Sequence, residues 1–163
     1  DEHQHCNYWK RTLRQDGMRL GAAPEDIKAQ HEMVCIAIEQ DGVALQHAPA
    51  GLRADRAVVM RAVHQGLALQ FASEELRADR HVVQVAVHRA GRALQFAAQR
   101  LRSDPGVARS AVRQDGLALQ FAAPVCRASR RIVQAAVEQN GLALEWASAT
   151  LRGNADVVEA AVQ

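Results

Sequence analysis

Apolar residues recur along this chain in two alternating patterns, and both patterns repeat about every 25 residues. The first pattern runs Gly-x-Ala-Leu-Gln-aromatic-Ala, as in Gly66-Leu-Ala-Leu-Gln-Phe-Ala72 and Gly116-Leu-Ala-Leu-Gln-Phe-Ala122. A fixed period of this length is typical of stacked helical repeats. The glycines that begin the pattern lie 24 or 25 residues apart, at Gly17, Gly42, Gly66, Gly91, Gly116 and Gly141.

The second pattern predicts a longer helix in every repeat. Val58, Val59, Ala62 and Val63 have the spacing i, i+1, i+4, i+5, which fits one stripe of an α-helix and does not fit a strand. Each such segment ends before a glycine of the first pattern, where we expect a left-handed C-cap. The side chains expected to cap the free N–H groups at the start of these helices are Asp55, Asp79, Asp104, Ser129 and Asn154.

The first pattern predicts a brief helix followed by a turn. Pro24, Pro49 and Pro124 come seven or eight residues after the glycine and would be costly inside a longer helix. At about 100° per residue, Phe71 falls on the apolar side of this helix and Gln70 on the opposite side. We therefore expect the aromatic side chains to lie in the core.

The predicted fold is all-α, an α-solenoid of about six two-helix repeats of ~25 residues that follows an N-terminal half-repeat. In the half-repeat, Tyr8, Trp9 and Leu13 take the places of the valines, and Asn7 is the expected cap. No polar capping unit follows the last valines, so we expect that end to continue or to be covered. We expect one array over residues 1–163, with a half-repeat at 1–16 and repeats at 17–41, 42–65, 66–90, 91–115, 116–140 and 141–163.

Composition indicates a folded protein without pointing to a ligand. Hydrophobic residues make up 48% of the chain and aromatic residues only 4%, so the core must be built from small side chains. A net charge of +2 neither requires nor excludes a nucleic acid or an anionic membrane. No apolar run has the ~20 residues of a membrane span, and no segment resembles a signal peptide. The three cysteines have neither disulfide nor zinc-site spacing, which favours a reducing compartment.

The segment from Gly66 to Val83, Gly-Leu-Ala-Leu-Gln-Phe-Ala-Ser-Glu-Glu-Leu-Arg-Ala-Asp-Arg-His-Val-Val, resembles the units of the repeat family catalogued as domain of unknown function 4116. The resemblance covers residues 17–163, with departures at residues 18–23 and at Cys126. It implies the helical repeat fold, and it implies no chemistry because the family has no assigned activity. The family's occurrence in algae and the missing initiator methionine leave an organellar compartment, such as a plastid, open.

An arginine follows the apolar residue that ends the first half of five repeats. In a stack these arginines would form a row of positive charge, spaced by roughly 10 Å, that an acidic partner or phosphate groups can contact. The structural alternative is that each pairs with a nearby carboxylate, such as Asp55, Asp79 or Asp104, or binds carbonyl groups at a turn. The candidate partner-binding residues are Arg53, Arg77, Arg102, Arg127 and Arg152.

Two further sets of polar positions recur. The first set hardly varies between repeats, so it cannot recognise the successive bases of a nucleic acid. We expect its side chains to hydrogen-bond between neighbouring repeats. It consists of Gln46, Gln70, Gln95, Gln120 and Glu145. The second set varies between repeats and lies on the outer face of the longer helix. Contact with a specific protein partner and simple exposure to solvent would each explain this variation. It includes Met60, Gln84, Arg109, Gln134 and Glu159, and also His64, His88, Arg113, Glu138 and Gln163.

The sequence predicts no catalytic, metal or cofactor site. His64 and His88 occupy equivalent places in neighbouring repeats and His81 is near, but a closed metal site needs three or four converging ligands. A catalytic site needs several chemically different side chains in one pocket. Near-identical repeats instead place the same side chain at regular intervals along a row. Cys126 replaces a leucine and is expected to be a small buried apolar residue.

The sequence therefore favours a non-catalytic protein-binding or structural subunit, a scaffold in a larger assembly whose partners are other protein subunits. Two alternatives stay open. One is nucleic-acid binding along the arginine row, which would weaken steeply with salt. The other is a regulatory repeat arm of a larger protein. The sequence leaves the oligomeric state undetermined.

Overall fold

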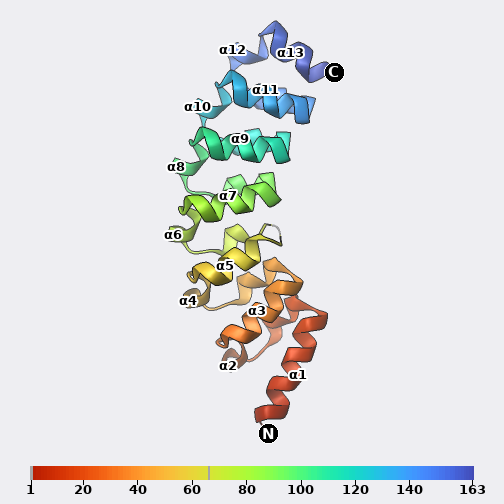
Figure 1. The fold of residues 1–163 in the computed structure, drawn as a ribbon, viewed down its shortest axis with the longest axis vertical. Helices are drawn as coiled ribbons and strands as arrows, with labels where there is room; N and C mark the ends of the chain where they lie inside the picture. Colours follow the sequence, from red (N-terminus) through yellow and green to blue (C-terminus); the bar gives the residue numbers. More distant parts are fainter. Residues whose placement is uncertain (1, 66) are drawn as a thin grey trace. The chain divides into compact units, whose positions relative to one another are not determined.

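A computed structural model describes residues 2–65 and 67–163 of the chain, which form helices joined by short turns (Figure 1). No strand occurs in those residues, so the prediction of an all-α protein is confirmed. The chain divides into two compact units, residues 1–76 and 77–163.

The first unit consists of two packed rows. The α-helices α1, α3 and α5 form one row, and the 3₁₀ helices η1, η2 and η3 form a second row against them. The short helices α2 and α4 pack on α3 and α5. The elements are α1 (Glu2–Gln15), η1 (Gly17–Ala22), α2 (Glu25–Lys28), α3 (His31–Gln40), η2 (Gly42–His47), α4 (Ala50–Arg53), α5 (Arg56–Val63) and η3 (Leu67–Phe71).

The second unit has the same two rows. The α-helices α7, α9, α11 and α13 follow one another side by side, and η4, η5 and η6 pack in sequence along them (Figure 1). The division between the units falls within α6 (Glu74–Arg77). The elements are α7 (Arg80–Arg89), η4 (Gly91–Phe96), α8 (Gln99–Arg102), α9 (Pro105–Gln114), η5 (Gly116–Phe121), α10 (Pro124–Arg127), α11 (Arg130–Gln139), η6 (Gly141–Trp146), α12 (Ala149–Arg152) and α13 (Ala155–Val162).

Each repeat contains three helical segments rather than the expected two. The brief first helix is a 3₁₀ helix, and the expected turn after it is a four-residue α-helix. Asp41 shows why the 3₁₀ helix starts where it does, because its carboxylate accepts from the N–H of Val43 at 2.8 Å. Pro49 and Pro124 mark the start of α4 and α10, a position where a missing N–H costs no helical hydrogen bond.

The core lies between the two rows and is built from small side chains. Ala118 and Leu119 of η5 and Val133 of α11 are all fully buried, and Cys126 is buried as expected. Phe71 is only half-buried, which corrects the prediction that it lies in the core, and the equivalent Phe96, Phe121 and Trp146 are half-buried as well.

The expected caps are confirmed at four of the five long helices. Asp55 accepts from the N–H groups of Ala57 and Val58 at 2.8 and 3.1 Å, and Asp79, Asp104 and Asn154 cap their helices in the same way. Ser129 makes no such bond, so that prediction was wrong. At the N-terminus, α1 already begins at Glu2, which places the expected cap Asn7 inside the helix.

The glycines do not form left-handed caps, because none that the structure describes has a positive φ. The long helix ends instead at an extended residue, as at Asp41 with φ −147° and ψ 113°. Gly42 is required because a Cβ there would overlap the carbonyl group of Ala62 in the long helix of the same repeat. The same overlap with the long helix would occur at Gly17, Gly91, Gly116 and Gly141, whereas Gly66 lies outside the described residues.

Candidate binding surfaces

The row of candidate arginines lies at the ends of the four-residue helices, and its backbone joins consecutive repeats. The carbonyl oxygen of each of the first four arginines accepts a hydrogen bond from an N–H group of the following repeat. Proline stands in the donor position at Pro49, so this bond cannot form at that earlier junction. The bonds run from Ser73 to Arg53 at 2.9 Å, Ala98 to Arg77 at 2.9 Å, Ala123 to Arg102 at 3.0 Å and Ser148 to Arg127 at 2.9 Å.

The side chains of this row are only partly available to a partner. Arg53, Arg102 and Arg127 are half-buried, and in each the Nε atom is buried without a hydrogen-bond partner in the described residues. Arg152 is exposed. No ion pair joins these four arginines to a carboxylate within residues 2–65 and 67–163, so the expected pairing with Asp55 or Asp104 does not occur there.

Two ion pairs between repeats come instead from arginines at the start of long helices, which sequence reasoning missed. Arg80 on α7 pairs with Asp104, the cap of α9, at 2.6 Å. Arg130 on α11 pairs with Asp156 on α13. Burial acts to raise the pKa of Asp104, but hydrogen bonds from the Val107 backbone and the Arg80 guanidinium outweigh it, so the pKa is lowered.

A glutamine near the end of α9 and of α11 bonds to the glycine that begins the 3₁₀ helix of its own repeat. Gln114 accepts from the N–H of Gly91 at 2.5 Å and donates to the carbonyl of Arg89 at 3.3 Å. Gln139 accepts from the N–H of Gly116 in the same way. The two partners lie 23 residues apart in sequence, so only the repeat period itself could have suggested the contact.

Three members of the expected glutamine row bond within their own repeat and not between repeats. Gln70, Gln95 and Gln120 each donate to a carbonyl three residues earlier, within their own 3₁₀ helix, at 3.0 to 3.3 Å. Gln46 reaches the preceding repeat, where its amide lies 3.9 Å from the sulfur of Met18.

The outer side of the 3₁₀ helices carries a row of apolar residues that sequence reasoning also missed. Leu67 is 37% exposed and Leu142 is 73% exposed, and Arg92 interrupts the row. Neighbouring 3₁₀ helices pack side by side, so the apolar positions are neighbours from η1 to η3 in the first unit and from η5 to η6 in the second. We call this surface the 3₁₀ face; it consists of Met18, Val43 and Leu67 in the first unit and of Leu117 and Leu142 in the second.

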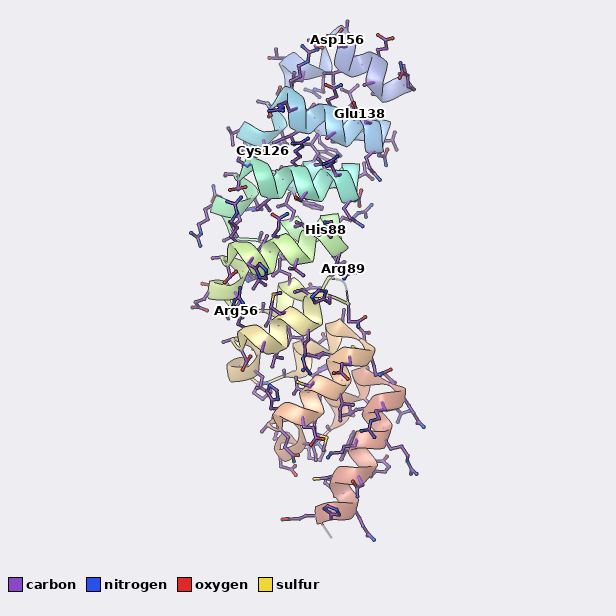
Figure 2. All side chains as sticks on the ribbon, viewed as in Figure 1. Arg56, His88, Arg89, Cys126, Glu138 and Asp156 are labelled. Carbon is purple, nitrogen blue, oxygen red and sulfur yellow. The ribbon has the colours of Figure 1, made fainter. Side chains whose placement is uncertain are left out.

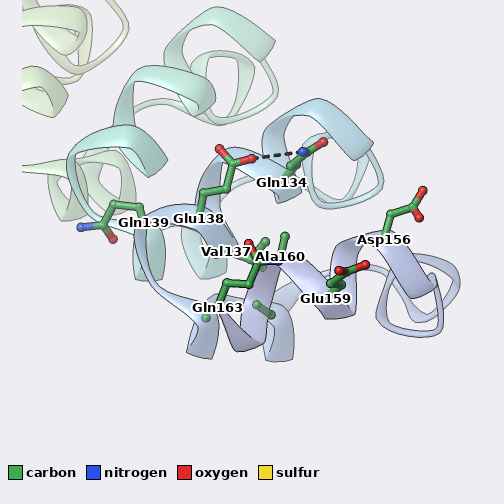
Figure 3. A pocket seen from close by; sticks show the side chains of 10 residues that line it. Gln134, Val137, Glu138, Gln139, Asp156, Glu159, Ala160 and Gln163 are labelled. Atoms are coloured by element: carbon green, nitrogen blue, oxygen red, sulfur yellow. Dashed lines mark hydrogen bonds between the residues drawn. The ribbon is translucent and has the colours of Figure 1, made fainter.

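A groove of about 550 Å³ lies between α11 and α13 (Figure 3). Gln134 donates to Glu138 at 3.0 Å on the α11 side, and Asp156 and Glu159 lie on the α13 side.

In the described part of the chain, no three His, Cys, Asp or Glu side chains are grouped so that they could hold a metal ion. His88 and Glu138, which occupy the same place in α7 and α11, are both exposed (Figure 2).

The buried cysteines are not placed as nucleophiles. The sulfur of Cys35 lies 3.6 Å from Nδ1 of His31, but burial raises the pKa of the thiol. Burial also raises the pKa of Cys126, whose sulfur lies 3.4 Å from the carbonyl oxygen of Ser103. A reactive cysteine needs a lowered pKa and solvent access.

Comparison with known families agrees with this architecture. The sequence matches the family described as Domain of unknown function (DUF4116) over residues 55–102 and 104–152. The chain belongs to the DUF4116 family. Each DUF4116 match begins at or beside a capping aspartate of a long helix and ends at an arginine of the row, so it spans two repeats. No curated protein and no solved structure matches the chain. Among the described helices, none is long and apolar enough to cross a membrane.

Proposed function

We propose that this DUF4116 chain is a non-catalytic protein-binding or structural subunit of a larger assembly. The observation that carries the proposal is the 3₁₀ face, where apolar side chains that are exposed or half-buried recur at one position of the repeat. Single exposed apolar residues are ordinary on protein surfaces, but a continuous apolar row is typical of a protein interface. Such a row suits a protein partner better than a phosphate backbone.

The proposed arrangement is an α-solenoid of about six repeats of ~25 residues after a half-repeat. Two observations support it. Both units contain the same rows, with long helices packed in sequence against 3₁₀ helices. The backbone bond to an arginine carbonyl also recurs in both units, from Ser73 to Arg53 in the first and from Ala123 to Arg102 in the second. A stack of this kind presents an extended surface without needing a thick core.

The arginine row is the second candidate contact for a protein partner. Its positive groups have no carboxylate partner at Arg53, Arg102, Arg127 or Arg152 within the described residues, so an acidic side chain of a partner could pair with them. Only Arg152 is exposed, however, and half-buried guanidinium groups present little charge to an extended phosphate backbone. The row therefore supports a protein partner more than a nucleic acid.

The test is affinity capture from an extract of the source organism with quantification by mass spectrometry. Leu67→Ser combined with Leu142→Ser changes the 3₁₀ face in both units, whereas Val125→Ser changes a 64% exposed apolar residue on α10. We expect the double variant to lose most of the captured protein and Val125→Ser to retain it, while circular dichroism shows both folded. Equal capture by all three proteins, or a strictly monomeric chain that captures nothing, would contradict the proposal.

A further inference from the structure

A small pocket lies between α10 and the junction of η6 with α12. It has a volume of about 160 Å³ and is lined by Pro124, Arg127, Trp146, Ala147 and Ser148. Arg127 is the one charged residue of this lining, and it belongs to the arginine row described above. We call this cavity the arginine pocket.

The guanidinium group of Arg127 has no acceptor in the described part of the chain. Its Nε atom is covered and forms no hydrogen bond there, and no ion pair joins the residue to a carboxylate. The side chain as a whole is half-buried, so its terminal nitrogens are the atoms that a ligand can reach. A guanidinium has five N–H donors, and burying part of a charged donor without an acceptor costs free energy. A ligand that supplies the acceptor removes this cost.

Ser148 supplies a second donor to the pocket. Its backbone N–H bonds to the carbonyl oxygen of Arg127 at 2.9 Å, which fixes the serine beside the arginine. Its hydroxyl makes no cap bond at the start of α12. At the earlier junction with Arg53, by contrast, the hydroxyl of Ser73 accepts from the N–H of Leu76 at 3.4 Å. The hydroxyl of Ser148 is therefore available to a ligand.

The opening of the pocket belongs to the junction between two consecutive repeats. Arg102 and Phe121 occupy the equivalent places one junction earlier, and both are half-buried like their counterparts in the pocket. That earlier junction has Ala123 where the pocket has Ser148, so it lacks the hydroxyl. The arginine pocket therefore combines a cation with a hydroxyl donor, which the preceding junction does not.

We infer that the arginine pocket binds the carboxylate of a glutamate or aspartate side chain from a protein partner. One guanidinium matches the single charge of a carboxylate, which accepts its N–H groups, and the hydroxyl of Ser148 can donate to the same group. A phosphate monoester carries about two charges and three acceptor oxygens, which a single cation leaves unmatched. This inference rests on the proposed function, because it names the chemistry of one contact with the protein partner.

The size and walls of the pocket also suit a side chain. A volume of about 160 Å³ is smaller than the ~300–1,000 Å³ of sites for small-molecule ligands. The rings of Pro124 and Trp146 form apolar walls against which the methylene groups of an acidic side chain can pack. Bound in this way, the carboxylate lies at the arginine and the rest of the partner stays outside the pocket.

The test follows the indole N–H signals of the full ¹⁵N-labelled chain by NMR. The chain has two tryptophans, so the signal of Trp9 in α1 is an internal control for that of Trp146. The probe is the blocked tripeptide Gly-Glu-Gly at pH 7 and low salt, compared with Gly-Gln-Gly at the same ionic strength. We expect the glutamate peptide to shift the Trp146 signal with a dissociation constant on the order of 10 mM, because one charge-assisted contact carries the affinity. The absence of a saturable shift, or an equal shift with Gly-Gln-Gly, would overturn the inference.

Four variants separate the pocket from net charge. Arg127→Gln should weaken binding of the glutamate peptide ~10-fold or more, whereas Arg131→Gln, which removes the same charge from an exposed residue of α11, should not change it. Arg127→Lys keeps the charge without the planar donor fork and should bind with intermediate affinity, and Ser148→Ala should bind several-fold more weakly. Circular dichroism checks that each variant is folded. Equal weakening by Arg127→Gln and Arg131→Gln would overturn the inference. If Arg127→Gln does not fold, unchanged binding in both Arg127→Lys and Ser148→Ala would do so.

Two further probes distinguish the source of the anion. Sodium acetate lacks the methylene and backbone groups that reach Trp146 and Pro124, so it should bind several-fold more weakly than the glutamate peptide. Equal affinity would contradict a side chain as the occupant. The peptide Gly-phosphoserine-Gly should bind within a few-fold of the glutamate peptide, and binding tighter by ~10-fold or more would make the pocket a phosphate site instead.

The inference and the proposed function can fail separately. A partner that is lost from the Leu67→Ser and Leu142→Ser double variant, together with no peptide shift at Trp146, would contradict the pocket alone. A saturable peptide shift in a chain that captures no protein would contradict the proposed function alone.

Discussion

Replacing Gly42 with alanine should destabilise the protein strongly, although alanine is normally the better helix former. A Cβ at Gly42 would lie 2.9 Å from the Cβ of Gln65 and 3.2 Å from the carbonyl carbon of Ala62, and nearer still to the Ala62 oxygen. Ordinary carbon contacts begin at about 3.5 Å, so η2 and α5 must move apart. Overpacking of this kind costs about 1–3 kcal/mol, and we expect the upper end because the nearest atoms belong to the Ala62 backbone, which cannot rotate away as a side chain can.

Gly51 in the same repeat provides the matched control. A Cβ there meets nothing within 4 Å, so Gly51→Ala should stabilise α4 by up to ~1 kcal/mol. In urea unfolding followed by circular dichroism, the midpoint should fall for Gly42→Ala and rise for Gly51→Ala. Heating should show the same, with a shift of about 2–4 °C per kcal/mol.

Gly42→Asn distinguishes close packing from a left-handed cap. Asparagine tolerates the left-handed conformation better than alanine does, so it would be the milder change if conformation selected the glycine. Close packing predicts instead that asparagine is at least as damaging as alanine. A midpoint for Gly42→Ala that matches or exceeds that of the wild type would refute the packing explanation.

Other contacts allow three further tests. The pKa of Asp104 is lower in the folded protein than in the unfolded chain, so the ionised carboxylate stabilises the fold at any pH above the ordinary pKa of aspartate. This stabilisation is lost as the pH falls through the lowered pKa of the folded protein. Asp104→Asn keeps a capping oxygen but has no charge. Its urea midpoint should therefore be lower than that of the wild type at pH 7, and it should fall less than the wild-type midpoint when the pH is lowered to 3. Gln114→Leu leaves the N–H of Gly91 without its partner and should cost about 1–3 kcal/mol by the same assay. Cys6, which is only half-buried, should react with a thiol reagent at neutral pH well before the buried Cys35, and equal rates would contradict the burial.

The sequence was sufficient to predict the features set by spacing along a helix. The stripe of Val58, Val59, Ala62 and Val63 predicts α5 and its buried face, because four side chains at i, i+1, i+4 and i+5 can only share one side of an α-helix. The cap at Asp55 is also predictable, since its bonds reach only two and three residues ahead.

The features that sequence reasoning missed depend on contacts across the repeat. The role of Gly91 follows from the carbonyl of Ala111 that approaches it, and a glycine before a new segment is locally indistinguishable from a left-handed cap. The partial burial of Phe71 likewise depends on the gap between two rows of helices. The apolar row that includes Leu142 was missed because its residues belong to the same short pattern as the core residues beside them.

Contacts in this protein are nearly all between residues within about one repeat of each other, and this limits how far any change can act. Gln114 bonds to Gly91 within its repeat, and Arg80 bonds to Asp104 in the next. In the proposed stack of repeats, stability is a sum of repeat and nearest-neighbour contributions. A damaged junction therefore weakens its own neighbours while more distant repeats keep their fold.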